Sequence, residues 1–279
     1  MSERLLDIKK DGVEMITYPE DLRYGVEHAA TLWKAFCDLP PEIKRRFSAE
    51  NTQNGVGYES KSGEGPHGDT KENFDFSIRG LNALLEAVET TNNKVAADFI
   101  AAVQSLGEHA APMIEQFGER LEVKHGVNGF GEIAKKSAPE AFFRFLHYPS
   151  GQTPGGTIAE AHTDHSGFTF HLYETTDGCQ RLTLDTRQWQ SLPVAEGEAA
   201  AFTSMQTQLV SGGEIKALSH RVLANETSSQ VGRFAIVCFV ALKDIPAYDK
   251  RTHGRLQEFT PGFNYDLTPE EFTKLFVKK

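Results

Sequence analysis

The chain has 279 residues, 39% of them hydrophobic, which is enough for a large core in one big or two small domains. Its formal net charge of −10 argues against general binding to nucleic acid or to a membrane surface, since both are anionic. The first ten residues contain no apolar signal core, and no stretch approaches the roughly 18 apolar residues of a spanning helix. The three cysteines form no disulfide-like pair, so we expect a reducing, cytoplasmic location.

The first 50 residues are predicted to be helical. Apolar residues recur at three- and four-residue spacing from Leu22 to Phe36. Leu39-Pro40-Pro41 ends this helix, and Pro41 can begin a short second one.

Residues 51–72 are rich in Gly, Ser, Asn and charged residues, which predicts a long loop that acts as a lid or contacts the substrate. A strong helical stripe follows at 92–121, where Pro112 is expected to kink or divide the helix.

From about residue 140 the apolar pattern changes to a period of two. Short runs occur at 141–148, 157–163, 168–173, 179–184, 199–203, 207–210, 218–223 and 233–241. About eight short strands separated by Gly- and Ser-containing turns are typical of a sandwich, jelly roll or barrel. A capping box at Thr268-Pro269-Glu270-Glu271 predicts a final short helix. We therefore expect helices that cover a single β core.

A candidate metal site lies within this strand region. His162 and Asp164 are two residues apart on a predicted strand, so their side chains project from the same side. His220, far downstream, can complete one face of a metal ion. Two histidines and one carboxylate suit non-heme Fe(II), although a His-x-Asp pair alone also arises readily by chance.

Arg233 opens the otherwise apolar strand at 233–241. A buried arginine is costly unless it is paired, so this side chain should meet an anion. A guanidinium can hold a carboxylate through two parallel hydrogen bonds. The alternative is an arginine that faces solvent at the mouth of the strand.

Motifs that agree in order are spread over roughly residues 20–242. They are Leu39-Pro40-Pro41-Glu42-Ile43-Lys44, Gly57-Tyr58, Asp69-Thr70-Lys71-Glu72-Asn73-Phe74-Asp75-Phe76, Phe143-Arg144-Phe145-Leu146-His147-Tyr148-Pro149, His162-Thr163-Asp164 with Thr169, Gly178-Cys179-Gln180, Trp189, and Leu218-Ser219-His220-Arg221-Val222. Together they resemble the iron- and 2-oxoglutarate-dependent dioxygenases of the isopenicillin N synthase-like type.

The resemblance implies a mainly β fold with flanking helices (α+β). A double-stranded β-helix, or jelly roll, would occupy about 139–242, behind a helical part at about 1–138 and before an extension at 243–279. All of 1–279 would form a single domain.

The resemblance also implies a site and an activity. His162, Asp164 and His220 would bind Fe(II), while Arg233 and Tyr148 would bind 2-oxoglutarate. O₂ would be consumed, with ascorbate as a supporting reductant. A small molecule would undergo C–H hydroxylation, desaturation or oxidative cyclisation, coupled to decarboxylation of 2-oxoglutarate to succinate, a chemistry typical of secondary metabolism.

The chain departs from the family pattern at the co-substrate pocket. The family usually has Arg-x-Ser, whereas this chain has Ala235 two residues after Arg233. The family also has an asparagine two residues before the tyrosine, where this chain has Leu146. The gap between His220 and Arg233 is longer than usual, so residues 225–230 are expected to form a longer hairpin. Losing one neutral hydrogen bond costs about 1 kcal/mol, which predicts weaker 2-oxoglutarate binding rather than its loss.

Strand parity identifies candidate substrate-binding residues. If Arg233 points into the barrel, so does Phe239, and Arg144 shares a face with Tyr148. Asn73 would reach in from the 51–76 loop. Arg144 favours a carboxylate-bearing substrate, although it could instead pair with a buried acid of the chain. Phe239 could instead be an ordinary residue of the hydrophobic core.

Three other functions remain open. The first is a same-fold Fe(II) oxidase that does not use 2-oxoglutarate. The second is a cupin-like hydrolase or isomerase that uses the triad for Zn(II). The third is a non-catalytic small-molecule-binding protein on the same jelly roll. The sequence does not indicate an oligomeric state.

Overall fold

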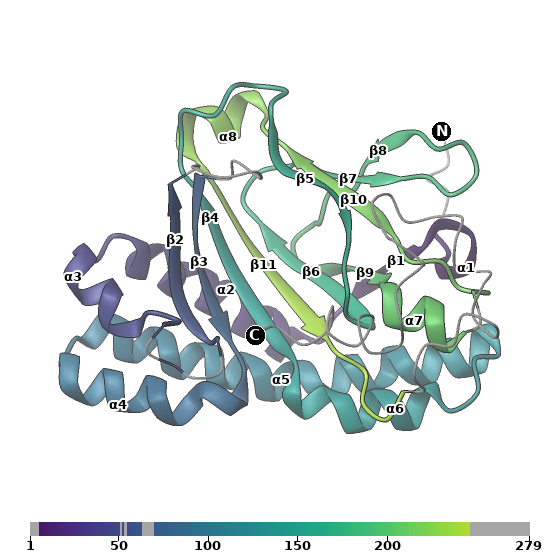
Figure 1. Cartoon of the computed structure of the whole chain (residues 1–279), viewed down its shortest axis with the longest axis horizontal. Coiled ribbons are helices and arrows are strands. Elements are labelled where there is room, and N and C mark those ends of the chain that lie inside the picture. Colours follow the sequence, from purple (N-terminus) through teal and green to yellow (C-terminus); the bar gives the residue numbers. More distant parts are fainter. Residues whose placement is uncertain (1–5, 51, 53–54, 63–69, 212, 246–279) are drawn as a thin grey trace.

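Two antiparallel β-sheets form the centre of the protein (Figure 1). The structure is a computed structural model that describes residues 6–50, 52, 55–62, 70–211 and 213–245. The larger sheet has the strand order β1-β9-β6-β11-β4-β3-β2, and the smaller sheet has the order β5-β10-β7-β8. The strands are β1 (Val13–Thr17), β2 (Gly57–Ser62), β3 (Thr70–Phe76), β4 (Phe142–Tyr148), β5 (Thr157–Thr163), β6 (Phe168–Glu174), β7 (Cys179–Leu182), β8 (Trp189–Ser191), β9 (Glu198–Thr203), β10 (Ser219–Leu223) and β11 (Arg233–Val240). The expected jelly-roll core with flanking helices is confirmed.

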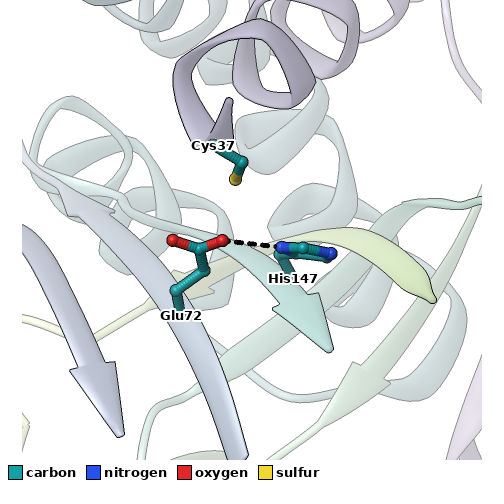
Figure 2. Close-up of side chains that lie close together, drawn as sticks. All are labelled: Cys37, Glu72 and His147. Carbon is teal, nitrogen blue, oxygen red and sulfur yellow. Dashed lines mark hydrogen bonds and ion pairs between the residues drawn. The ribbon is translucent and has the colours of Figure 1, made fainter. Parts of the chain in front are cut away.

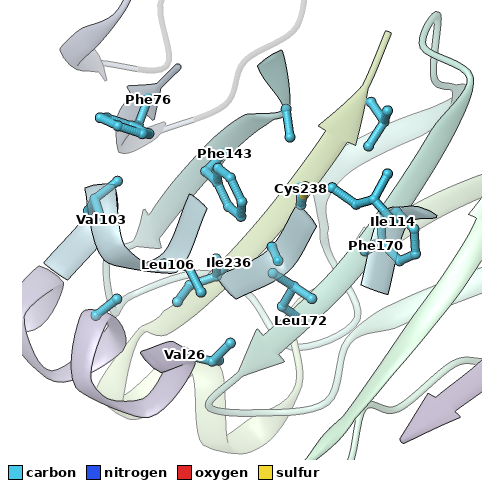
Figure 3. Packing of buried hydrophobic residues seen from close by; sticks show 14 of the residues in the cluster. Val26, Phe76, Val103, Leu106, Ile114, Phe143, Phe170, Leu172, Ile236 and Cys238 are labelled. Atoms are coloured by element: carbon cyan, nitrogen blue, oxygen red, sulfur yellow. The ribbon is translucent and has the colours of Figure 1, made fainter. Parts of the chain in front are cut away.

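Helices cover one face of the larger sheet (Figure 1). The two longest are α2 (Glu20–Cys37) and α5 (Lys94–His125). The shorter α-helices are α1 (Ile8–Asp11), α3 (Pro41–Lys44), α4 (Leu81–Thr91), α6 (Phe130–Ser137), α7 (Met205–Val210) and α8 (Glu226–Val231), and 3₁₀ turns occupy Arg45–Phe47, Ile78–Gly80 and Ala138–Glu140. Figure 3 shows side chains of α2 and α5 packed on those of β4, β6 and β11, among them Val26, Leu106, Phe143, Phe170 and Ile236.

Aromatic rings fix β4 against the helical layer. Trp33 of α2 stacks on Phe99 of α5 with ring centroids 5.6 Å apart, and Phe99 meets Phe145 of β4 edge to face at 5.2 Å. The indole Nε1 of Trp33 donates to the backbone oxygen of Leu146 at 3.2 Å. Such aromatic contacts stabilise beyond the area they bury, so the strand that carries Arg144 and Tyr148 has a rigid support.

The predicted parity of the last strand is confirmed. Ile236 and Cys238 belong to the core beneath the helices, whereas Ala235 and Val237 pack with Leu146 and Tyr148 in the cluster between the sheets. Opposite residues of β11 and β4 share a face, so the barrel side carries Arg233 opposite Tyr148 and Val237 opposite Arg144.

The N-terminal half departs from the prediction at two places. Residues 57–62 and 70–76, expected to be loop, pair as β2 and β3 and extend the sheet beyond β4. Their alternation was hidden by polar side chains, because one face of β3 holds Asn73 and Asp75 while the other buries Phe74. The second place is β1, which lies within the segment expected to be helical and pairs with β9.

Two shorter predictions after residue 200 are also wrong. Residues 207–210 belong to helix α7 rather than to a strand. The segment at 225–230, expected to be a hairpin, forms α8, which Asn225 begins with a capping box to Ser228. Both runs are too short for periodicity alone to separate helix from strand. Helix α5 is continuous through Pro112, so the proline does not divide it.

The predicted C-terminal helix at 268–276 lies outside the described residues, as does most of the extension at 243–279. Within the ranges given above, no helix combines the length and the apolar character that crossing a membrane requires.

Candidate metal centre and substrate pocket

His162, Asp164 and His220 come together at the end of the smaller sheet. His162 lies on β5 directly opposite His220 on β10, and Asp164 follows the last residue of β5. One potential ligand atom from each of the three side chains lies within 4.8 Å of the others. The structure therefore brings the predicted triad to the spacing that a single metal ion needs.

The histidine rings are oriented for coordination through Nε2. Nδ1 of His162 lies 2.6 Å from the backbone oxygen of Glu160, a hydrogen bond that leaves Nε2 available. Nε2 of His162 and Nε2 of His220 lie 3.5 Å and 3.9 Å from the two carboxylate oxygens of Asp164. Burial lowers the pKa of His220 to about 4, so this ring is neutral and can donate a lone pair at neutral pH.

Asp164 is held as a carboxylate by its neighbours. Burial by itself raises the pKa of Asp164, but its interactions with His220 and His162 and the hydrogen bond from Thr169 bring this pKa well below its usual range. The Thr169 hydroxyl donates to Oδ2 at 2.6 Å, and the backbone oxygen of Asp164 accepts from Met205 at 3.0 Å. Two imidazoles and one ionised carboxylate are a ligand set that fits Fe(II).

Arg233 is buried and meets an anion, as its position in an apolar strand predicted. Nη2 of Arg233 donates to Oε2 of Glu174 at 2.7 Å, and each side chain is 2% exposed. Tyr148, directly opposite Arg233, is also buried, and the ammonium of Lys71 lies 5.9 Å from its ring centroid. The binding of 2-oxoglutarate by Arg233 and Tyr148 stays a prediction.

The three candidate substrate-binding residues lie together on the barrel side of β3, β4 and β11. Arg144 makes two hydrogen bonds of 2.7 Å to the carboxylate of Asp75. Nδ2 of Asn73 donates to the same carboxylate at 3.3 Å, and the guanidinium carbon of Arg144 lies 5.8 Å from the Phe239 ring centroid. The buried acid weighed as an alternative partner of Arg144 is therefore present, and it is Asp75.

A second group of potential ligands consists of Cys37, Glu72 and His147, which Figure 2 shows converging from α2, β3 and β4. Nδ1 of His147 lies 2.8 Å from Oε1 of Glu72, and Oε2 accepts from the ammonium of Lys44 at 2.8 Å and from the hydroxyl of Tyr58 at 2.7 Å.

This second group is better explained as an ion-pair network than as a metal site. Lys44 already supplies a cation beside the Glu72 carboxylate, where a metal ion would have to bind. Burial and the nearby Glu72 charge raise the pKa of the Cys37 thiol far above its usual range, so the thiol stays protonated. The network joins α2 and α3 to the strands that carry Asn73 and Tyr148.

Sequence reasoning did not assign to the site two polar residues that lie close to Arg233. They are Glu174 and His171, both buried on β6. The alternating pattern of β6 could have placed His171 beside Thr169, since both lie on the same face. No pattern in the sequence marks Glu174, because a register shift between β6 and β11 turns it inward.

The strands that carry these residues resemble those of a known protein family. Residues 139–241 match the family model of the 2OG-Fe(II) oxygenase superfamily. Feruloyl CoA ortho-hydroxylase 2 of Arabidopsis thaliana is 24% identical over 251 residues, which cover 84% of this chain and 64% of that enzyme. The chain thus spans slightly less than two thirds of the length of this relative.

Two solved structures share the fold. The dioxygenase for auxin oxidation of rice superposes with a TM-score of 0.68 at 19% identity, covering 96% of this chain and 86% of that one. The dioxygenase for auxin oxidation 1 of Arabidopsis thaliana, solved as a complex with 2-oxoglutarate, gives 0.66 at 17% identity, covering 84% of each chain. At these identities the likeness concerns the fold.

Proposed function

We propose that this chain is a non-heme Fe(II)- and 2-oxoglutarate-dependent dioxygenase acting on a small molecule. The premise is that the chain belongs to the 2OG-Fe(II) oxygenase superfamily, whose family model residues 139–241 match. The observation that carries the proposal is the triad of His162, Asp164 and His220, whose ligand atoms lie within 4.8 Å of one another. The triad lies on the same jelly roll as a buried arginine, Arg233.

Each residue has a distinct role in this proposal. His162, Asp164 and His220 would hold Fe(II) on one face and leave the opposite face open. Iron, 2-oxoglutarate and O₂ together supply the oxidant for a C–H bond, while 2-oxoglutarate loses CO₂ and becomes succinate. Arg233 would bind the distal carboxylate of 2-oxoglutarate, and the Tyr148 hydroxyl would add a hydrogen bond. The barrel walls would keep water from the reacting centre.

The substrate would bind against the barrel side of β3, β4 and β11, where Phe239 and Asn73 flank Arg144. A carboxylate on the substrate would share the Arg144 guanidinium with Asp75, whereas Phe239 offers an apolar surface. Hydroxylation is favoured over desaturation or ring closure, because the Arabidopsis relative is an ortho-hydroxylase. Residues 1–279 would act as one domain, and a cytoplasmic location fits the three buried, unpaired cysteines.

A second candidate is a same-fold Fe(II) oxidase that does not use 2-oxoglutarate. The specific observation in its favour is the Arg233–Glu174 ion pair, since a carboxylate of the chain already occupies part of the arginine. Ala235, buried beside it, offers no hydroxyl to a co-substrate.

Succinate formation separates these functions. The protein is incubated with Fe(II), ascorbate, O₂ and 2-oxoglutarate, with and without a panel of aromatic and carboxylate-bearing small molecules. We expect succinate above the background of the Asp164→Ala variant, stimulated by the right substrate. An iron-loaded, folded protein that forms no succinate under any condition and binds no 2-oxoglutarate anaerobically would exclude the main proposal. Oxidation of a substrate without succinate would favour the oxidase.

A further inference from the structure

Glu174 and Arg233 form a closed ion pair inside the barrel. Oε2 of Glu174 accepts from Nη2 of Arg233 at 2.7 Å, and Oε1 accepts from the backbone N–H of Val194 at 3.1 Å. Nε of Arg233 donates to the backbone oxygen of Thr176 at 3.2 Å. Part of the guanidinium that would receive an external carboxylate is therefore already used by the chain.

A bulge in β6 turns Glu174 toward Arg233. The pairing with β11 runs from Phe239 opposite Thr169 to Val237 opposite His171, but then slips by one residue, so that Ala235 faces Glu174. Regular alternation would place Glu174 on the helical side, away from Thr169 and His171. The extra residue in β6 moves it to the barrel side.

His171 lies beside this pair with a buried, unused nitrogen. The side chain of His171 is 5% exposed, and its Nε2 is 3.7 Å from Oε2 of Glu174. This Nε2 has no hydrogen-bond partner among the described residues. Burial and the Arg233 charge lower the pKa of His171 to about 3, so the ring is neutral. A buried polar atom without a partner is costly, and a polar ligand between Arg233 and the triad would satisfy it.

We propose that Glu174 competes with the distal carboxylate of 2-oxoglutarate for Arg233 and thereby sets a low affinity of this chain for its co-substrate. The inference rests on the proposed function. The Arg233–Glu174 pair is neutral as it stands, and both side chains are 2% exposed. A second carboxylate would give the buried group a net negative charge, which is unfavourable unless Glu174 is protonated or withdraws.

Glu174→Gln tests this competition, because the amide keeps the shape of the side chain but removes its charge. The affinity for 2-oxoglutarate is measured by anaerobic calorimetry on the Mn(II)-loaded protein and its variants. We expect Glu174→Gln to bind 2-oxoglutarate on the order of tenfold more tightly than the native chain, which corresponds to about 1.4 kcal/mol. Glu174→Asp, which keeps the charge, should stay close to the native affinity.

Thermal unfolding supplies a second readout. Without 2-oxoglutarate, Glu174→Gln leaves Arg233 as an unpaired buried cation, so its Tm should fall. Saturating 2-oxoglutarate restores a partner, so the rise in Tm on adding it should be larger in this variant than in the native protein. The control is Glu196→Gln, which removes an exposed carboxylate that pairs with Arg23 and should change neither quantity.

The outcomes separate this inference from the proposed function. If the native protein binds 2-oxoglutarate and a folded Glu174→Gln binds it equally or less tightly, Glu174 is not a competitor and the proposed function stands. If only the variant binds, the competition is real but the native chain does not use 2-oxoglutarate. If neither binds, both ideas fail. Should Glu174→Gln not fold, Glu174→Ser is measured in the same way and carries the same expectation.

Discussion

His162 and His220 lie directly opposite each other on antiparallel strands β5 and β10, with ring centroids 4.3 Å apart. Opposite residues in such a pair project from the same face, so the register of two strands fixes the separation of the two imidazoles. Asp164 joins them from the turn that follows β5. Side chains on strands are more precisely positioned than side chains on loops, so the two histidines form the rigid part of the site.

Asp164→Ala should abolish stoichiometric binding of Fe(II) or Mn(II), because it removes the only carboxylate of the triad. Equilibrium dialysis followed by elemental analysis measures the bound metal. The matched control is His165→Ala, the next residue along the chain, which lies in the bend after β5 and has an exposed side chain. Metal loss in the control as large as in Asp164→Ala would contradict this ligand set.

Thr169→Val should weaken metal binding without removing it. The Thr169 hydroxyl orients Asp164 through a 2.6 Å hydrogen bond, and such supporting contacts typically contribute about 10- to 100-fold in metal affinity. A competition titration with a chelator measures the change. The control is Thr203→Val. It also removes a buried threonine hydroxyl, but this hydroxyl donates to the backbone oxygen of Lys216, so metal affinity should stay unchanged. Equal effects of both variants would reduce the role of Thr169 to general stability.

Arg233→Met should weaken 2-oxoglutarate binding far more than Mn(II) binding. A hydrogen bond to a charged group contributes about 1.5–3 kcal/mol, so a loss of at least tenfold is expected. The same measurement on Arg233→Met combined with Glu174→Gln avoids leaving Glu174 as an unpaired buried anion. Calorimetry with each ligand gives the two affinities. Parallel losses of metal and 2-oxoglutarate would show that Arg233 is structural.

Glu72 should contribute to stability above about pH 4.5 and lose that contribution in acid. Burial alone raises its pKa, but hydrogen bonds from His147, Lys44 and Tyr58 lower it to about 2 from its usual 4.5. The unfolded chain therefore binds a proton first as the pH falls from 4.5 toward 2, and the folded state is penalised. Allowing for solvent screening, the effect is on the order of 1–2 kcal/mol.

Urea unfolding at pH 7, 5, 4 and 3 checks this expectation. Glu72→Gln should be less stable than the native protein at pH 7 and should lose less stability on acidification. The control, Glu89→Gln, replaces an exposed carboxylate and should follow the native curve. If Glu72→Gln and the native protein lose stability equally between pH 5 and pH 3, the ion-pair network has no such role.

The metal ligands and the barrel side of β4 and β11 could be predicted from sequence because they depend on local alternation. The two-residue spacing predicted that His162 and Asp164 lie side by side, although β5 ends at Thr163 and Asp164 lies in the turn after it. Arg233 had to meet an anion because it opens a buried strand. The strands β2 and β3 were not predicted, because a segment with so many polar side chains is also typical of a loop. β3 pairs along its length with β4, for example Asn73 opposite Leu146, and no local pattern reveals such pairing.

The identity of the anion at Arg233 could not be predicted for a similar reason. Glu174 has the wrong parity to face the barrel, and only the slipped register between β6 and β11 turns it inward. Asp75 likewise meets Arg144 through cross-strand pairing of β3 with β4. Both partners come from strand register, which is a property of the assembled sheet.

Anaerobic titration of the Fe(II)-loaded protein with 2-oxoglutarate tests the central claim most directly, because a visible charge-transfer absorption appears only when the co-substrate binds the iron itself. We predict a saturable absorption in the native protein that reaches one 2-oxoglutarate per iron and is absent in His220→Ala. An iron-loaded, folded native protein without this absorption at any 2-oxoglutarate concentration, or an equal absorption in His220→Ala, would contradict the account.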